Sequence, residues 1–431
     1  MAKKAINKNK ANKLSEFIFK GRKVLLPIFL ICIIVSLFLI PKYHYVYNTN
    51  SANAIKKSEN TISNEQIEKK FGKNNTLVIL FKNSEKDYSK ELELAKELDQ
   101  VEKINSITSI GGYSISDNIY LGTKVNYLEI SKIFNISPDI TLKLYQFYAN
   151  ANNELEKLEN LVDYRITIID LINFLNEYQN SLPIPENLKN QITSYYQLIE
   201  AKLPLLESSE YTRFILNLDA PVESSETYSL VNDIRKIAEA KYDDVVLVGN
   251  TINAIDLEKS FTADNFIITA ITVLFIALIL IFTFKSFGAT LLLILTIEGS
   301  ILINFGITVL TNKEIFFMGY VVVSAIQMGA TIDYAIVITT RYLGLRKKMD
   351  KKEAIINTLN DCLPAVITSG SILTIAGFLI GFISTSSVIS QIGLFLGVGT
   401  LISLIATIFV LPAILYVCDS FIKKTTIKKE K

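Results

Sequence analysis

Six long apolar segments constrain the fold of this chain more than any other feature of its sequence. They cover about residues 24–40, 264–284, 289–310, 316–340, 363–383 and 388–417. A helix needs about 20 apolar residues to cross a bilayer, and about 17 is the lower limit, so each segment can span one. No small-residue cleavage site follows the first segment, which indicates an anchor rather than a cleaved signal peptide. The sequence therefore predicts an α-helical membrane protein with six transmembrane helices.

The distribution of Lys and Arg predicts the orientation of these helices. Basic residues gather in residues 1–23, in the loop between the fourth and fifth segments, and in the tail at 418–431. An even number of spans places all three on one side, and the positive-inside rule makes that side the cytoplasm. We therefore expect a first span at 24–40, spans two to six within 264–417, cytoplasmic termini, and an extracytoplasmic domain at 42–262.

The region 42–262 alternates predicted strands and helices in a recognisable order. The elements are strand 76–81, helix 87–99 and strand 104–110, then strand 211–218, helix 224–240 and strand 245–248. Two successive βαβ units of this kind are the pattern of an α+β, ferredoxin-like sandwich. A segment at about 124–203 separates the two halves, and its apolar residues recur at helical spacing, so we expect three or more helices there. This insertion is either a structural cap on the sandwich, which we favour, or an arm that contacts a substrate or partner through its tyrosines.

The fourth segment carries an ionisable residue, Asp333, well inside an otherwise apolar stretch. A carboxylate in the middle of a membrane costs at least about 2.5–3.5 kcal/mol, so it must be neutral, paired or close to water. Ala325, Gly329 and Asp333 stand four residues apart and share one face of the helix. Small residues mark faces where membrane helices pack closely. We therefore expect Asp333 to face protein rather than lipid.

Three further polar residues lie inside predicted spans. Glu298 in the third segment lies at nearly the depth of Asp333, with a difference of about 3 Å along the helix axes. The two carboxylates could share a proton or a cation if their helices touch, but a simple hydrogen bond from Glu298 to a neighbouring hydroxyl or amide is the slightly favoured alternative. Asn304 lies about 120° from Glu298 around the helix, which predicts a different contact for it. Gln327 adds a polar group to the fourth segment.

Two pairs of glycines predict close helix packing. Gly377 and Gly381 lie in the fifth segment, and Gly393 and Gly397 lie in the sixth. A spacing of four residues lets two helix backbones approach each other. We interpret both pairs as ordinary packing contacts.

The sequence lacks the residues that several functional classes require. The three cysteines lie in or beside apolar segments, and the only histidine, His44, follows the first span, where an interfacial role is the favoured interpretation. We expect no metal site, no cofactor, no nucleotide or nucleic-acid partner, and no enzymatic activity, since no nucleophile–base set or nucleotide-binding motif appears. Any active transport must then use an ion gradient or a partner. One charge that crosses 100 mV yields about 2.3 kcal/mol, which is adequate for a proton relay through Asp333.

The order of one span, a large domain and five spans resembles the repeat of the resistance-nodulation-division (RND) superfamily. Within it, the chain resembles the C-terminal six-span half of the MMPL family in residues 327–334 and 341–342, in 71–76 and in 248–250. The resemblance implies a bacterial cell membrane location and proton-driven export of lipids or other hydrophobic compounds. It also places Asp333 and Tyr334 at the positions of the family's proton relay.

The chain departs from this family in size, because family members usually have twelve spans and two Asp–Tyr pairs. The resemblance therefore implies a homodimer, a separately encoded second half, or a fragment of a longer product. Two alternatives stay open: a non-pumping membrane scaffold or lipid sensor, and an accessory of protein translocation like SecD and SecF, which we rank last.

Overall fold

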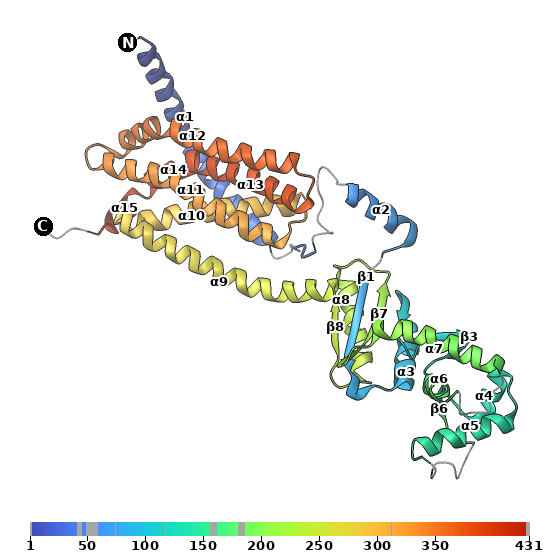
Figure 1. The fold of residues 1–431 in the computed structure, drawn as a ribbon. Helices are drawn as coiled ribbons and strands as arrows, with labels where there is room; N and C mark the ends of the chain where they lie inside the picture. The colour runs from blue at the N-terminus through green and yellow to red at the C-terminus, as the bar shows by residue number, and fades with distance from the viewer. Residues whose placement is uncertain are drawn as a thin grey trace. The chain divides into compact units, whose positions relative to one another are not determined.

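The computed structural model divides the chain into two compact units (Figure 1). The helical unit comprises Met1–Gln66 and Asp256–Lys431, and the α/β unit comprises Ile67–Ile255. The structure describes residues 2–40, 45–48, 59–73, 75–116, 118–154, 156, 162–179, 186–311 and 313–427, without the side chains of residues 2–14, 187 and 262. His44 and the basic residues at 428–431 lie outside the described residues.

The helical unit consists of an N-terminal helix, which the α/β unit separates in sequence from the rest, and of further helices joined by short connections. They are α1 (Ala2–Leu39), α9 (Asn250–Phe284), α10 (Phe287–Leu310), α11 (Phe317–Arg346), α12 (Lys351–Ile383) and α13 (Ser387–Ile405), followed by the π-helix η4 (Ala406–Val410), α14 (Leu411–Val417) and α15 (Asp419–Lys424). In the described part of the chain, six helices are long and apolar enough to cross a membrane, with α13, η4 and α14 together forming the last. The expectation of six helices that can span a membrane is confirmed.

Several helices extend beyond the limits that hydropathy predicts. The fifth is the clearest case, since α12 begins at Lys351 instead of 363. The side chain of Asp350 caps its first turn by accepting a hydrogen bond of 3.0 Å from the Lys352 amide. Hydropathy detects only the part of a helix that is apolar, whereas the cap determines where the helix begins.

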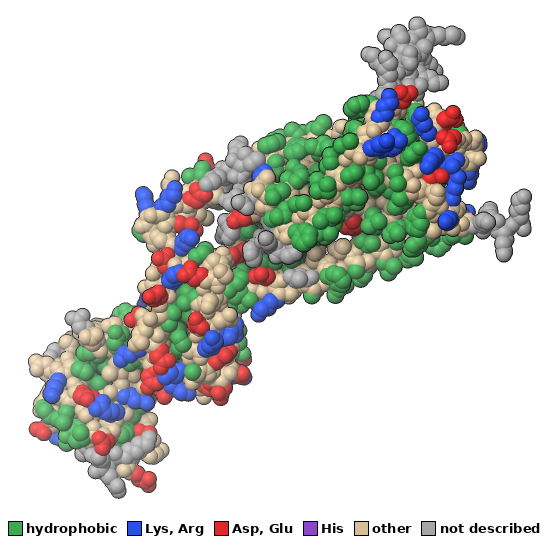
Figure 2. Space-filling view, turned by 180° about the vertical axis from the view of Figure 1, so that it is seen from behind, with side chains coloured by type: hydrophobic (Ala, Val, Ile, Leu, Met, Phe, Trp, Pro, Cys, Tyr) green, Lys and Arg blue, Asp and Glu red, His purple; other side chains and the backbone are tan. Residues whose placement is uncertain are grey.

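Helix α10 lies in the middle of the helical unit, and α9 lies at its edge. Most of the apolar stretch of α10 is buried, and that of α9 is almost entirely exposed. The core includes side chains from α10, α11, α12 and α13, among them Leu293, Val323, Leu359 and Phe395. In Figure 2, hydrophobic side chains cover the visible face of this unit, and charged side chains gather at one end of it.

The α/β unit is built on a four-stranded antiparallel sheet in the order β2-β7-β1-β8. Its elements are β1 (Asn75–Lys82), the 3₁₀ turn η2 (Asn83–Glu85), α3 (Tyr88–Asp99), β2 (Ile104–Thr108), β7 (Tyr211–Leu218), α8 (Ser225–Glu239) and β8 (Val246–Gly249). Leu94 and Leu98 of α3 and Ile234 of α8 share one core with the buried residues of β1 and β7. Every second residue of β7 is buried, which is the pattern of a strand with one face on the core. A further helix, α2 (Glu59–Phe71), precedes β1.

The described residues of the insertion and its flanks form four helices and a core of their own. Its elements are the strand pairs β3 (Ser114–Ser116) with β4 (Ile119–Tyr120) and β5 (Lys124–Val125) with β6 (Ile166–Thr167), and the helices α4 (Tyr127–Phe134), α5 (Pro138–Ala151), α6 (Ile168–Tyr178) and α7 (Glu186–Leu206). Tyr145 and Ile168 lie fully buried in this core. These four helices agree with the expectation of three or more.

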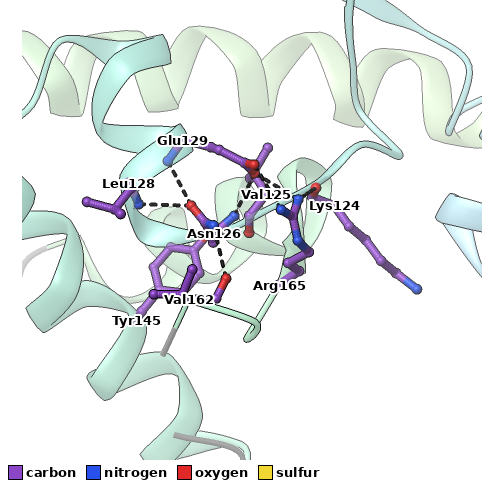
Figure 3. A network of polar contacts seen from close by, with 8 residues as sticks. All are labelled: Lys124, Val125, Asn126, Leu128, Glu129, Tyr145, Val162 and Arg165. Atoms are coloured by element: carbon purple, nitrogen blue, oxygen red, sulfur yellow. Dashed lines mark hydrogen bonds and ion pairs between the residues drawn. The ribbon is translucent and has the colours of Figure 1, made fainter. Parts of the chain in front are cut away.

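A polar network fixes the start of α4 (Figure 3). The side chain of Asn126 accepts hydrogen bonds from the backbone amides two and three positions on, at 3.1 and 2.9 Å. The Glu129 carboxylate accepts one from the Asn126 backbone amide at 3.1 Å. The side-chain amide of Asn126 also donates to the Val162 carbonyl at 3.0 Å. Arg165 bonds both carboxylate oxygens of Glu129 at 2.9 Å. The network ties α4 to the segment that leads into β6.

Candidate functional site

Asp333 lies on an exposed face of α11. Ala325, Gly329 and Asp333 are all exposed in this chain, and nothing lies within 4 Å of a side chain added at Gly329. The expectation that Asp333 faces protein is therefore wrong within this chain. The buried face of α11 is formed instead by larger side chains such as Val323 and Gln327, and Gln327 stands about 120° from Asp333 around the helix.

Tyr334 has different surroundings from its neighbour Asp333. Its side chain is half-buried and packs against the core of the helical unit. Consecutive residues of an α-helix point about 100° apart, which accounts for the difference. Of the two predicted relay residues, Tyr334 thus packs within the helix bundle, whereas Asp333 is exposed on its surface.

Gln327 and Asn304 join three helices through a buried amide network. The Asn304 side-chain nitrogen donates to the Phe395 carbonyl at 3.2 Å and lies 3.5 Å from the Gln327 side-chain oxygen. The Gln327 side-chain nitrogen donates to the Gly399 carbonyl at 3.0 Å and to the Ser403 hydroxyl at 2.6 Å. These bonds connect α10, α11 and α13 on the buried side of α11, away from Asp333. Asn304 and Glu298 make different contacts, as predicted.

Glu298 lines a small cavity between α9, α10 and α11. Its neighbours there include Asn265 of α9 and Tyr320, Ser324 and Met328 of α11. One carboxylate oxygen of Glu298 is buried without a hydrogen-bond partner among the described residues. Asp333 does not line this cavity, so the similar depth expected for Glu298 and Asp333 does not bring both carboxylates into it. Tyr320 and Ser324 were not anticipated, although their four-residue spacing, continued at Met328, defines one stripe of α11.

The four glycines of the fifth and sixth segments lie where α12 meets α13. A Cβ atom built on Gly377 would lie 2.6 Å from the Gly397 nitrogen, and one built on Gly393 would lie 2.5 Å from the Gly381 nitrogen. Such distances leave no room for any side chain. The two helices therefore touch backbone to backbone along this glycine seam, defined by Gly377, Gly381, Gly393 and Gly397.

An ionic cluster joins the end of α11 to α15. The Tyr342 hydroxyl donates to Asp419 Oδ1 at 2.7 Å, and Arg346 bonds both carboxylate oxygens at 3.0 and 3.2 Å. Burial raises the pKa of Asp419, but the bonds from Arg346 and Tyr342 and the charges of Arg346 and Lys423 outweigh it and hold this pKa below its ordinary value. The pairing joins residues 77 positions apart. Local sequence patterns contain no signal for it.

A second candidate site is a groove in the α/β unit, with a volume of about 1080 Å³. Its lining includes the tyrosines Tyr88, Tyr148 and Tyr164, the basic residues Lys86, Lys124 and Arg165, and the acidic residues Asp87, Glu154, Asp163 and Asp170. All three bases are paired, Lys86 with Glu207 at 2.7 Å, Arg165 with Glu129 at 2.9 Å, and Lys124 with Asp87 at 4.0 Å. Burial raises the pKa of Asp170, although a hydrogen bond from Thr167 opposes this. The groove is wide, mixed in charge and bordered by the insertion.

Glu91 is a buried carboxylate beneath the start of the insertion. It is fully buried, one of its oxygens accepts a hydrogen bond of 2.9 Å from the Gly111 amide, and the other has no partner among the described residues. Burial raises the pKa of Glu91 to about 7, the bond from Gly111 opposes the rise, and the charge of Glu207 adds to it. A Cβ atom at Gly111 would lie 2.3 Å from the Tyr88 carbonyl oxygen, so only glycine fits this turn.

Six helices long and apolar enough to cross a membrane, three of them joined by a buried amide network, indicate a multi-pass membrane protein. The model of the MMPL family matches residues 207–430, just over half of the chain. The chain therefore belongs to the MMPL family, which is a family of RND-type membrane transporters.

Two kinds of relative accompany this assignment. The membrane protein ActII-3 of Streptomyces coelicolor is 28% identical over 193 residues, which are 43% of this chain and 27% of that protein. Two crystal forms of a heavy metal efflux pump match 95% of this chain and 49% of the pump chain, at 12% identity and TM-scores of 0.48 and 0.49. This chain thus spans about half of the pump chain and a smaller part of ActII-3, and the structural likeness is too weak to carry an argument about function.

Proposed function

We propose that this chain is one six-span unit of a proton-driven MMPL transporter that exports lipids or other hydrophobic compounds. In this proposal Asp333 binds the transported proton, Tyr334 assists it, and the exposed face of α11 packs against a second unit. That unit is either another copy of the chain or a second six-span half. The observation that carries the proposal is the exposure of Asp333 on an apolar helix.

The surroundings of Asp333 support the proposal that a second unit covers this face of α11. Ile326 and Val337, on the same side of α11, expose 38% and 47% of their surface. A carboxylate left among such side chains in lipid costs at least about 2.5–3.5 kcal/mol. Ala325 and Gly329 leave space for another helix to approach closely. A neighbour at this face would bury Asp333 in protein and offset that cost.

Two-fold pairing through this face would bring two Asp333 carboxylates towards each other, because a two-fold interface places the same surface on both partners. Carboxylates that share a site cannot both stay ionised, which raises the proton affinity of one. Such a pair can take up a proton on one side of the membrane and release it on the other. The charge distribution fits this arrangement, since α11 ends at Arg346 in a basic loop.

The orientation and the outer domain are part of the proposal. The basic loop and termini support a cytoplasmic location for both chain ends, with the α/β unit outside. The sheet order β2-β7-β1-β8 with α3 and α8 supports a ferredoxin-like sandwich. The groove of the α/β unit also favours a second candidate function, a scaffold or lipid sensor that binds through this unit without pumping.

The test is Asp333→Asn in proteoliposomes that contain a fluorescently labelled phospholipid and an imposed pH gradient. The asparagine keeps the shape but cannot ionise, so we expect transport driven by the gradient to fall at least tenfold. The matched control is Asp361→Asn, which removes an exposed carboxylate paired with Arg341 at 2.5 Å and should keep the wild-type rate. A wild-type rate for Asp333→Asn would refute the relay. If the activity of the protein tolerates Asp333→Asn but is lost on deletion of 124–203, the scaffold hypothesis would be favoured.

A further inference from the structure

The cavity at Glu298 is a built polar site inside an apolar bundle. Six polar side chains line it: Asn265, Thr269 and Thr272 from α9, Glu298 from α10, and Tyr320 and Ser324 from α11. Its volume is about 40 Å³. A water molecule needs roughly 10–15 Å³ by the same measure. The cavity therefore has room for a small ion with a water, but not for a lipid.

Two oxygen atoms in this cavity lack partners. The Glu298 Oε1 and the Ser324 Oγ are both buried without a hydrogen bond of good geometry from a described residue. The Ser324 side chain interacts with Tyr320 one turn earlier. Leaving a buried polar group unsatisfied costs about 1–3 kcal/mol, and more when the group is charged. Two such atoms facing the same small cavity indicate that something else normally contacts them.

The chemistry of the lining narrows the choice of occupant. Every polar side chain present can offer an oxygen atom, and oxygen ligands suit hard cations. Only Glu298 among the lining residues carries a formal charge. One carboxylate neutralises one positive charge, and an apolar medium strongly disfavours any charge that is left over. A divalent ion would leave such an excess, so a monovalent cation fits the site best.

The cavity also has a polar approach from one end of α11. Tyr320 is the fourth residue of α11, and Ser324 follows one turn further along. On α9, the lining residues run from Asn265 to Thr272, which is about 10 Å along the helix axis. These side chains extend the polar lining of the cavity from Glu298 towards that end of α11.

The site is separate from Asp333. Met328 lines the cavity, and Asp333 stands about 140° from it around α11. Ala325 of the exposed face also borders the cavity, but Asp333 does not, so Asp333 and the cation site can be altered separately.

From these observations we infer that Glu298, with Ser324 and Tyr320, binds a single monovalent metal cation of the size of Na⁺. The cation satisfies both orphaned oxygens and bridges α10 to α11. Its binding does not depend on the proton relay, and the two can be tested independently.

The experiment measures binding of ²²Na⁺ to the purified full-length chain in detergent by a scintillation proximity assay. We expect saturable binding of about one ion per chain, competed by unlabelled Na⁺ but not by choline. Glu298→Gln should weaken binding at least tenfold, and Ser324→Ala should weaken it severalfold. Two controls should bind as wild type: Asp333→Asn, and Glu353→Gln, which alters an exposed carboxylate at the start of α12.

Each result decides the inference. Absence of saturable binding, unchanged binding in Glu298→Gln, or equal competition by choline would overturn it, since the cavity would then hold only water or a proton. A size-exclusion profile identical to wild type ensures that Glu298→Gln is folded, and Ser324→Ala provides a milder variant if it is not. Loss of binding in Glu298→Gln with normal binding in Asp333→Asn would support the site even if the proposed relay fails.

Discussion

Replacing Gly377 by alanine would place a methyl group in the glycine seam, where α12 and α13 touch backbone to backbone. The added Cβ atom would lie 2.6 Å from the Gly397 nitrogen, 0.8 Å short of the 3.4 Å at which ordinary contact begins. The neighbour is backbone, so no side-chain rotation can relieve the clash. The helices must separate or tilt by a comparable amount.

The energetic cost follows from this displacement. A gap of 0.5–1 Å forfeits about a quarter to a half of each van der Waals attraction along an interface. Overpacking of this kind costs about 1–3 kcal/mol, and the better helix propensity of alanine returns up to about 1 kcal/mol. We expect a net loss of about 1–2 kcal/mol. This corresponds to a fall of a few degrees in the melting temperature.

The measurement is thermal unfolding of the purified chain in detergent, followed by circular dichroism. Gly344→Ala is the matched control, because nothing lies within 4 Å of a Cβ atom there, and its melting temperature should stay the same or rise slightly. Gly393→Ala should behave like Gly377→Ala, since its Cβ atom would lie 2.5 Å from the Gly381 nitrogen. If Gly377→Ala is as stable as Gly344→Ala, the seam is not a close contact and the reasoning is wrong.

Two further predictions concern the α/β unit. Burial raises the pKa of Glu91 to about 7, above its value of about 4.5 in the unfolded chain, so its contribution to stability is complete below pH 4.5 and is lost as pH rises through 7. Glu91→Gln should therefore flatten the pH dependence and slow hydrogen exchange around Gly111 at pH 8; exchange that stays as in wild type would count against the raised pKa. Asn126→Ala removes the cap of α4 and should destabilise the insertion by about 1–2 kcal/mol. Hydrogen exchange of 127–134 measures this, and Asn190→Ala on α7 is the control, because its side chain caps no helix; equal exchange in the two variants would contradict the capping role.

The spans and the sheet were predictable because their signals are local. Each span is a run of apolar residues, and each strand of the four-stranded sheet shows its own alternation or apolar run, so the predicted limits of the sheet strands and of α3 and α8 agree within about two residues. The helix limits in the membrane were harder to place. Caps such as Asp350 lie in polar sequence that hydropathy does not detect.

The environment of Asp333 was not predictable from this chain alone. A stripe of small residues indicates close packing, but it does not tell whether the neighbour belongs to the same chain. The bundle instead buries larger side chains on another face of α11, above all the amide of Gln327. Contacts between distant segments, such as Tyr342 with Asp419, leave no periodic pattern in the sequence.

The π-helix η4 affects how this chain should be aligned with its relatives. A π-turn accommodates one residue more than an α-helix over the same path, so Ala406–Val410 amounts to an insertion within the last span. A relative with one residue fewer here would have an ordinary helix and the same faces on either side. A deletion elsewhere in the span would rotate every later side chain by about 100°. A relative that is one residue shorter in the last span should therefore be aligned with its gap at 406–410.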